Sequence, residues 1–141
     1  MFDPVAYVTE RHNYWWNHLL QNTPGANTIA DKTPPAIRWA FHKSRKHACA
    51  NHLYCKYNMN YVLLRREDYD STIAHELCHS LARRMRLNDG PQGHGAFWQY
   101  LHKHICGFSG ERFYKGEVRC TEVLPSVKAI KTLITILEKR S

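Results

Sequence analysis

The feature that most constrains this chain is residues 71–98, because two histidines there stand four residues apart. The letters H-E-L-C-H at positions 75–79 complete an H-E-x-x-H motif, and a third histidine, His94, follows fifteen residues after His79. On an α-helix, side chains at positions i and i+4 lie one above the other on the same face. A helix through the motif would therefore direct His75 and His79 to one point, with Glu76 beside them.

The surrounding residues predict this helix and its ends. Apolar residues recur at every fourth position, which is typical of a buried helical stripe. They are Ile73, Leu77, Leu81 and Met85. Asp68, Asp70 or Ser71 could cap the start of the helix. The turn-forming residues 88–91 predict its end, and a second amphipathic helix is expected over residues 94–105.

The spacing of the histidines predicts a metal site. Imidazole is a habitual ligand of zinc, and three protein ligands leave one tetrahedral position open, as in catalytic zinc sites. His75, His79 and His94 are the candidate ligands, and Glu76 would lie close enough to touch a water molecule on the metal. The alternative interpretation is an ordinary surface helix that carries two histidines.

The same residues resemble a known family. H-E-x-x-H at 75–79, followed by H-G-A-F-W at 94–98, is similar to the SprT-like (Spartan-type) metalloprotease domain, whose pattern is H-E-x-x-H, a loop and then H-G-x-x-F/W. The resemblance is strong over residues 73–114 and extends back to residue 37. It implies one zinc ion per chain, Glu76 as the catalytic base and Trp98 at the family's aromatic position. The zinc ligands that it implies are His75, His79 and His94.

The resemblance also implies a fold. It is a small zincin-like α+β domain, in which a short antiparallel or mixed sheet packs on the H-E-x-x-H helix between N- and C-terminal helices. The 141 residues are enough for one hydrophobic core, so residues 1–141 are expected to form a single domain with its metal-site core at about 61–106. Many members carry a C-terminal zinc ribbon of paired cysteines, and this chain has no C-x-x-C motif.

The remaining segments complete this prediction. An apolar and aromatic face over residues 4–20, which includes Trp15 and Trp16, indicates a helix that packs on the zinc domain. An aromatic surface that stacks nucleic-acid bases is the alternative. Residues 22–35 are expected to form a loop. Strands are predicted at 37–41, 48–54, 58–64 and 116–123, and a closing helix at 125–139.

The charge of the chain indicates a polyanionic partner. The net charge is +8 and the isoelectric point is about 9.4, which favours nucleic acid, although a basic soluble protein is the alternative. Lys43, Arg45 and Lys46 are the candidate phosphate contacts, in a basic run that could also be a solvated turn. DNA, single-stranded or crosslinked to protein, is the nucleic acid that the family resemblance implies.

The cysteines and the N-terminus predict a location. Five cysteines form no disulfide framework, and the N-terminus has no apolar signal core. No apolar run approaches the length of a membrane span. These observations predict a cytoplasmic protein with free thiols and no membrane partner. Cys78 lies inside the motif but on another side of the helix from the histidines, which predicts a buried thiol rather than a metal ligand.

The predicted function is that of a zinc-dependent endopeptidase, whose partners are protein substrates. Tyr114 is a candidate contact for the substrate or the oxyanion. Two alternatives remain at this stage: a non-catalytic, zinc-stabilised module that binds nucleic acid or protein, and a zinc hydrolase with a non-protein substrate. An intact Glu76 argues against the first, and the His94-Gly95-x-x-Trp98 continuation argues against the second. No feature predicts an oligomeric state.

Overall fold

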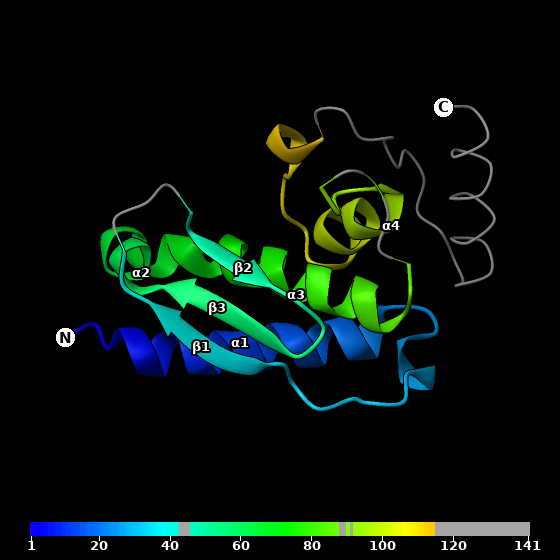
Figure 1. Ribbon diagram of the computed structural model, residues 1–141, viewed down its shortest axis with the longest axis horizontal. Coiled ribbons are helices and arrows are strands. Elements are labelled where there is room, and N and C mark those ends of the chain that lie inside the picture. The colour runs from blue at the N-terminus through cyan, green and yellow to red at the C-terminus, as the bar shows by residue number, and fades with distance from the viewer. Residues whose placement is uncertain (43–45, 88–89, 91, 115–141) are drawn as a thin grey trace.

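The computed structural model describes residues 1–42, 46–87, 90 and 92–114, and these form a small α+β domain (Figure 1). One sheet has the strand order β1-β3-β2, with β1 (Ala36–Ala40), β2 (Ala48–Ala50) and β3 (Tyr54–Asn58). Helices α1 (Pro4–Asn22) and α3 (Asp70–Arg84) lie side by side behind it. The short helix α4 (Ala96–Gln99) continues into a π-helical segment, η3 (Tyr100–Ile105), which packs on both long helices.

The shorter helical segments connect these elements. They are η1 (Ala26–Thr28), α2 (Met59–Arg65), η2 (Arg66–Tyr69) and η4 (Glu111–Phe113). The structure confirms the predicted α+β class with a mixed sheet. The strand predicted at 116–123 and the helix predicted at 125–139 lie outside the described residues. No helix of the described part is long and apolar enough to cross a membrane.

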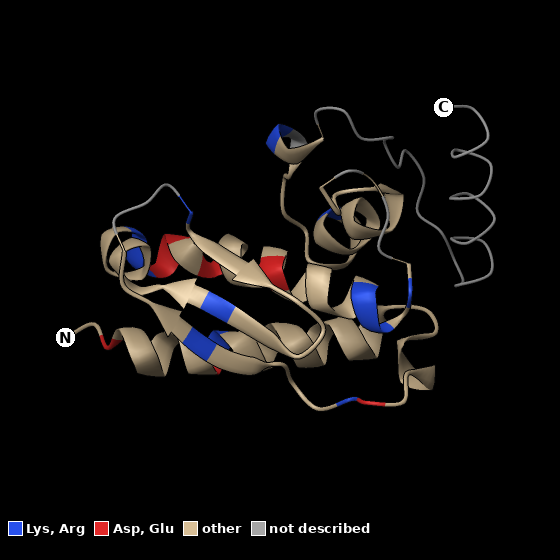
Figure 2. Ribbon diagram, viewed as in Figure 1, with Lys and Arg blue, Asp and Glu red and all other residues tan. Residues whose placement is uncertain are grey.

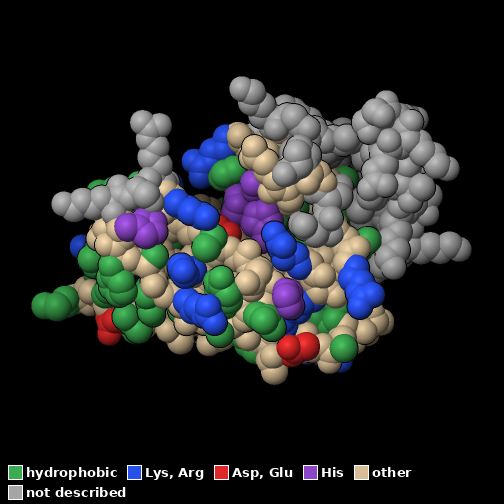
Figure 3. All heavy atoms as spheres, viewed as in Figure 1, with side chains coloured by type: hydrophobic (Ala, Val, Ile, Leu, Met, Phe, Trp, Pro, Cys, Tyr) green, Lys and Arg blue, Asp and Glu red, His purple; other side chains and the backbone are tan. Residues whose placement is uncertain are grey.

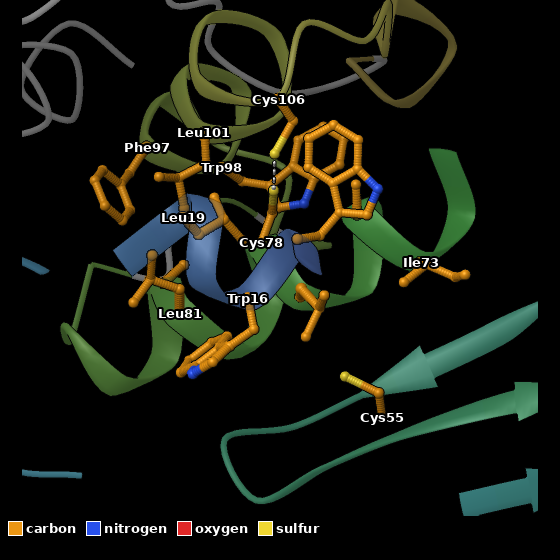
Figure 4. Close-up of a cluster of buried hydrophobic side chains, with 14 of the residues drawn as sticks. Trp16, Leu19, Cys55, Ile73, Cys78, Leu81, Phe97, Trp98, Leu101 and Cys106 are labelled. Carbon is orange, nitrogen blue, oxygen red and sulfur yellow. Dashed lines mark hydrogen bonds between the residues drawn. The ribbon is translucent and has the colours of Figure 1, made fainter. Parts of the chain in front are cut away.

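Helix α1 is a packing helix, as its apolar face predicts. The Asp3 carboxylate caps its start by accepting a hydrogen bond from the Ala6 amide at 3.1 Å, and Pro4 fits the first turn. Trp15 and Trp16 are buried in the core, where Trp16 and Leu19 lie near Cys78 of α3 (Figure 4). These two tryptophans are therefore not available to stack nucleic-acid bases, whereas Tyr14 of the same helix is exposed.

A buried histidine joins α1 to the sheet. His12 Nε2 lies 2.7 Å from the Pro35 carbonyl oxygen, and His12 Nδ1 lies 2.7 Å from the Tyr57 hydroxyl. Because a carbonyl can only accept, Nε2 must carry the proton, and Nδ1 accepts from Tyr57. Burial lowers the pKa of His12, which favours this neutral form. The tautomer therefore fixes how α1 docks against β3 and the chain entering β1.

The sheet is mixed because β3 pairs in parallel with β1 and antiparallel with β2. Cys55 and Tyr57 of β3 point towards the helices and are fully buried. Alternate residues point the other way, so Arg38 of β1 and Lys56 of β3, which are register partners, lie next to each other on the outer face. Figure 2 shows these basic residues side by side on the two strands.

The strand predicted at residues 58–64 is wrong, because this segment forms helix α2. The Asn58 side chain caps the helix by accepting a hydrogen bond from the Asn60 amide at 3.2 Å. Val62 is fully buried, whereas the neighbouring Leu63 and Leu64 are exposed, so the apolar run does not alternate as a strand would. The residues expected to separate two strands, 55–57, instead form the centre of β3.

The predicted cap of the motif helix is also wrong. Helix α3 begins at Asp70 and has no side-chain cap. The Asp70 carboxylate accepts hydrogen bonds from α1 instead: from Arg11 Nε at 2.8 Å and Nη2 at 3.2 Å, from Trp15 Nε1 at 2.8 Å and from the Tyr7 hydroxyl at 3.1 Å. Asp70 therefore fixes the motif helix to α1 rather than orienting a metal-binding imidazole.

Replacing Asp70 should loosen this contact between helices. In Asp70→Asn, the new amide group would face the Arg11 and Trp15 donors, so the free energy of unfolding should fall by about 1.5–3 kcal/mol, the range for hydrogen bonds to a charged group. Urea unfolding measures this change. Asp68→Asn removes the same charge from an exposed neighbouring side chain and is expected to change the free energy by less than about 0.5 kcal/mol. If both substitutions lowered the free energy of unfolding equally, the proposed role of Asp70 in holding α3 against α1 would be contradicted.

Candidate metal centre

Helix α3 and the loop before α4 bring three histidines together. His75 and His79 lie one turn apart on α3, and His94 reaches them from the loop. The three Nε2 atoms form a nearly equilateral triangle, with 3.2 Å between His75 and His79, 3.1 Å between His79 and His94, and 3.2 Å between His94 and His75. Each of these residues is 9% exposed, so one edge of the cluster reaches the surface.

This triangle fits a tetrahedral metal ion. Zinc with Zn–N distances of about 2.0–2.1 Å spaces its nitrogen ligands by about 3.3 Å, close to the separations here. Burial, together with the smaller effect of the neighbouring imidazoles, lowers the pKa of His75 well below its ordinary value and that of His79 to about 3. The neutral imidazole is the form that binds metal. The residues present therefore fit a zinc ion with three protein ligands.

The aromatic residue of the second motif supports all three histidines. The Trp98 ring stacks on His79 at 24° with centroids 5.5 Å apart, and its edge contacts with His75 and His94 have centroid distances of 4.7 Å and 4.6 Å. Trp98 Nε1 donates to the His75 carbonyl oxygen at 3.2 Å, and Gln99 Nε2 donates to the His94 carbonyl oxygen at 2.8 Å. Trp98 is thus a support for the histidine cluster, and Gln99 is a support that the sequence analysis missed.

Phe113 packs against two of the three histidines and against the Trp98 ring, with its centroid 5.8 Å from that of Trp98, and the sequence analysis missed it. Its ring lies 4.3 Å from that of His75 and stacks on His94 at 26° with centroids 5.2 Å apart. Nothing in the sequence places Phe113 against residues almost forty positions earlier. The spacing of the aromatic residues in the sequence does not predict this contact between Phe113 and the histidines.

Glu76 lies beside the cluster in a buried position. It is 6% exposed, and burial raises its pKa to about 8, while the charge of Lys46 acts in the opposite direction. A carboxyl group that titrates near neutral pH is suited to accept and then return a proton. The motif predicts that Glu76 lies beside the histidines, and the structure shows in addition that its side chain is buried.

A cleft of about 310 Å³ opens next to His75 and Glu76. It lies between α3, the start of β2 and the segment 109–113, and Figure 3 shows histidine side chains gathered in this hollow with basic side chains nearby. The residues that line it are His47, Ala48, Ser71, Thr72, His75, Glu76, His102, Ser109, Arg112 and Phe113. The histidine cluster and Glu76 are therefore accessible to a ligand.

Other predicted site residues lie elsewhere. Tyr114 is buried beside a second hollow, with Phe108 and Gly110, and does not line the cleft, so its contact with a substrate stays a prediction. Lys46 is exposed, and Lys43 and Arg45 lie outside the described residues. Cys78 is a buried free thiol 3.9 Å from the Cys106 sulfur, as expected of a core residue (Figure 4).

His102 is a residue near the site that the sequence analysis did not single out. The helix that carries it begins at Ala96. His102 therefore lies one turn after Trp98, and their rings stack at 15° with centroids 4.7 Å apart. Its ring centroid lies 5.7 Å from that of His75, which places His102 in the wall of the cleft.

The fold and the site define a small α+β domain with an H-E-x-x-H helix, a third histidine from a following loop and a buried glutamate at a cleft. The family model of the SprT-like family matches residues 6–119, and the chain belongs to this family. Comparison with curated proteins gave no match. Comparison with solved structures gave no match either.

Proposed function

We propose that this protein is a zinc-dependent endopeptidase of the SprT-like type. The observation that carries the proposal is the triangle of Nε2 atoms, 3.1–3.2 Å apart, beside the buried carboxyl group of Glu76 at an open cleft. Membership of the SprT-like family supports the same reading. His75, His79 and His94 would hold one zinc ion per chain.

The roles of the chain's own residues follow from this arrangement. When bound, zinc supplies Lewis-acid polarisation of the scissile carbonyl and makes a water molecule more acidic. Glu76 accepts the proton of the attacking water and then donates it to the leaving amine, as general base and general acid in turn. Trp98 and Gln99 hold the carbonyl groups of His75 and His94, so the ligands keep their positions through the reaction.

Recruitment to DNA is the second part of the proposal. The net charge of +8 and the adjacent basic residues Arg38 and Lys56 on the outer face of the sheet favour a polyanion. Lys46, together with Lys43 and Arg45 of the same run, would add contacts to phosphates. Binding of this kind depends steeply on salt because counterions are released.

Zinc content and cleavage of casein, each with and without single-stranded DNA, test this proposal. We expect one zinc per chain and cleavage that stops on chelation, returns with added zinc and increases with DNA at low salt. One zinc per chain without cleavage in any condition would favour the alternative of a non-catalytic binding module. Absence of metal from the folded protein would contradict both functions.

A further inference from the structure

His102 is a buried polar residue without a partner in the wall of the cleft. It is 2% exposed, and neither ring nitrogen has a hydrogen-bond partner among the described residues. The Ser71 backbone lies near the ring but does not form a hydrogen bond of acceptable geometry with it. A buried donor left without an acceptor destabilises the fold, so its retention at a cleft indicates an acceptor that arrives with a ligand.

Two neighbours hold His102 in this orientation. The Trp98 ring stacks on it, which fixes the plane of the imidazole. Gly110 lies at the edge of both rings: a Cβ atom at Gly110 would come within 2.8 Å of His102 Nδ1 and 3.2 Å of the Trp98 ring. The absence of a side chain at Gly110 therefore leaves the space that the His102 ring needs.

Arg112 supplies a positive charge in the same cleft. The Arg112 side chain lines the cleft together with His47, His75 and His102. Its partner in the structure is the ring of Phe113, with 4.7 Å from Cζ to the ring centroid. No carboxylate whose side chain the structure describes forms an ion pair with it.

The chemistry of the cleft wall selects the ligand. Besides the zinc ligand His75, the wall offers two imidazoles, one guanidinium and the hydroxyl groups of Ser71, Thr72 and Ser109. Its one carboxyl group is that of Glu76, which the proposed reaction uses. A guanidinium and an imidazole in the wall of one cleft are suited to a carboxylate.

We propose that this cleft binds an acidic side chain of the polypeptide substrate, next to the scissile bond, with Arg112 and His102 as the residues that determine specificity. This inference rests on the proposed endopeptidase function and names the substrate class of the same site. An aspartate or glutamate side chain fits within a cleft of about 310 Å³ that Arg112 and His102 line. The same cleft includes His75 and Glu76 of the proposed catalytic centre, which favours a residue of the polypeptide being cleaved over a nucleic acid.

Matched peptides test the assignment. A single glutamate is moved through the positions that flank the scissile bond, and each peptide has counterparts with glutamine and lysine at that position. At one position, the wild type should cleave the glutamate peptide with a kcat/KM about 10- to 100-fold above that of the glutamine peptide. Arg112→Glu should reverse the preference towards lysine. Arg86→Glu makes the same charge change at an exposed residue away from the cleft and should leave the ratio unchanged.

The His102→Phe variant distinguishes a role of His102 in substrate specificity from a role in the stability of the fold. Phenylalanine keeps the stack on Trp98 but has no ring nitrogen, so the glutamate preference should fall about tenfold while cleavage of the glutamine peptide continues. Because the substitution removes a buried donor without a partner, the Tm should stay the same or rise. Unchanged glutamate preference in a folded His102→Phe protein would overturn the assignment of His102.

Binding of the same peptides to zinc-loaded Glu76→Gln tests the proposed pocket separately from the proposed endopeptidase activity. Tighter binding of the glutamate peptide, weakened about tenfold or more by Arg112→Glu, supports the pocket even if the wild type cleaves nothing. Equal Kd values for the glutamate and glutamine peptides overturn it. Loss of oligonucleotide binding in Arg112→Glu, with the peptide ratio unchanged, would assign the cleft to phosphate instead and also overturn it.

Discussion

Glu76→Gln is expected to retain about one zinc per chain and to lose proteolysis. The amide cannot accept the proton of the attacking water, and general-base catalysis contributes about 10²- to 10⁴-fold to a rate. We therefore expect kcat/KM for a peptide substrate to fall by a factor in this range. Metal analysis and cleavage rates are to be measured on the same preparation, so that loss of zinc is not mistaken for loss of the base.

The fold should tolerate this substitution. Burial raises the pKa of Glu76 from its ordinary value of 4.5 to about 8, so the folded protein holds this proton more tightly than the unfolded chain. The stability that this protonated group contributes is complete below pH 4.5 and is lost as the pH rises through about 8. Glutamine is uncharged at every pH. The unfolding midpoint of metal-free Glu76→Gln should thus equal or exceed that of the wild type at pH 8.

An exposed glutamate provides the matched control. Glu10→Gln makes the same change on the outer side of α1 and should leave zinc content, cleavage and unfolding unchanged. If zinc-loaded Glu76→Gln cleaved within about fivefold of the wild-type rate, the assigned role of Glu76 would be contradicted. So small a loss of rate lies below the range expected for removal of a general base.

The site was predictable where its chemistry depends on local spacing. An i, i+4 histidine pair must share a helical face, so the motif alone placed His75, His79 and Glu76. His94 was a candidate ligand from its position after the motif and also from the resemblance to a family pattern, but helix geometry does not place it. The structure brings these residues together as predicted, and it adds the burial of Glu76, which no spacing rule provides.

The rest of the site depends on contacts between distant segments. His102 and Phe113 reach the cluster only because η3 and residues 109–113 pack across α3. The sequence carries no periodicity that links these positions to His75. The strand predicted at 58–64 failed for a local reason, since Tyr61, Val62, Leu63 and Leu64 suit a strand by composition, whereas the Asn58 cap starts a helix. Capping therefore outweighed β-propensity there.

Removal of zinc is expected to destabilise the whole domain. Three buried, neutral imidazoles converge at 3.1–3.2 Å, and without a cation their lone pairs face one another. Any ligand that binds only the folded state stabilises it, by about 4 kcal/mol at a free concentration one thousand times Kd. Chelation should therefore lower the free energy of unfolding by about this amount and lower the Tm accordingly.

His79→Ala tests whether zinc stabilises the protein by binding at the histidine cluster. His79 takes part in two of the three close contacts of the triangle and also stacks on Trp98, so its loss should abolish stoichiometric zinc binding. The Tm of His79→Ala should then be the same with zinc and with chelator, and close to that of the chelated wild type. His52→Ala removes an exposed imidazole and should keep the full response to zinc. An undiminished zinc-dependent rise in Tm for His79→Ala would mean that the metal stabilises the protein at another site.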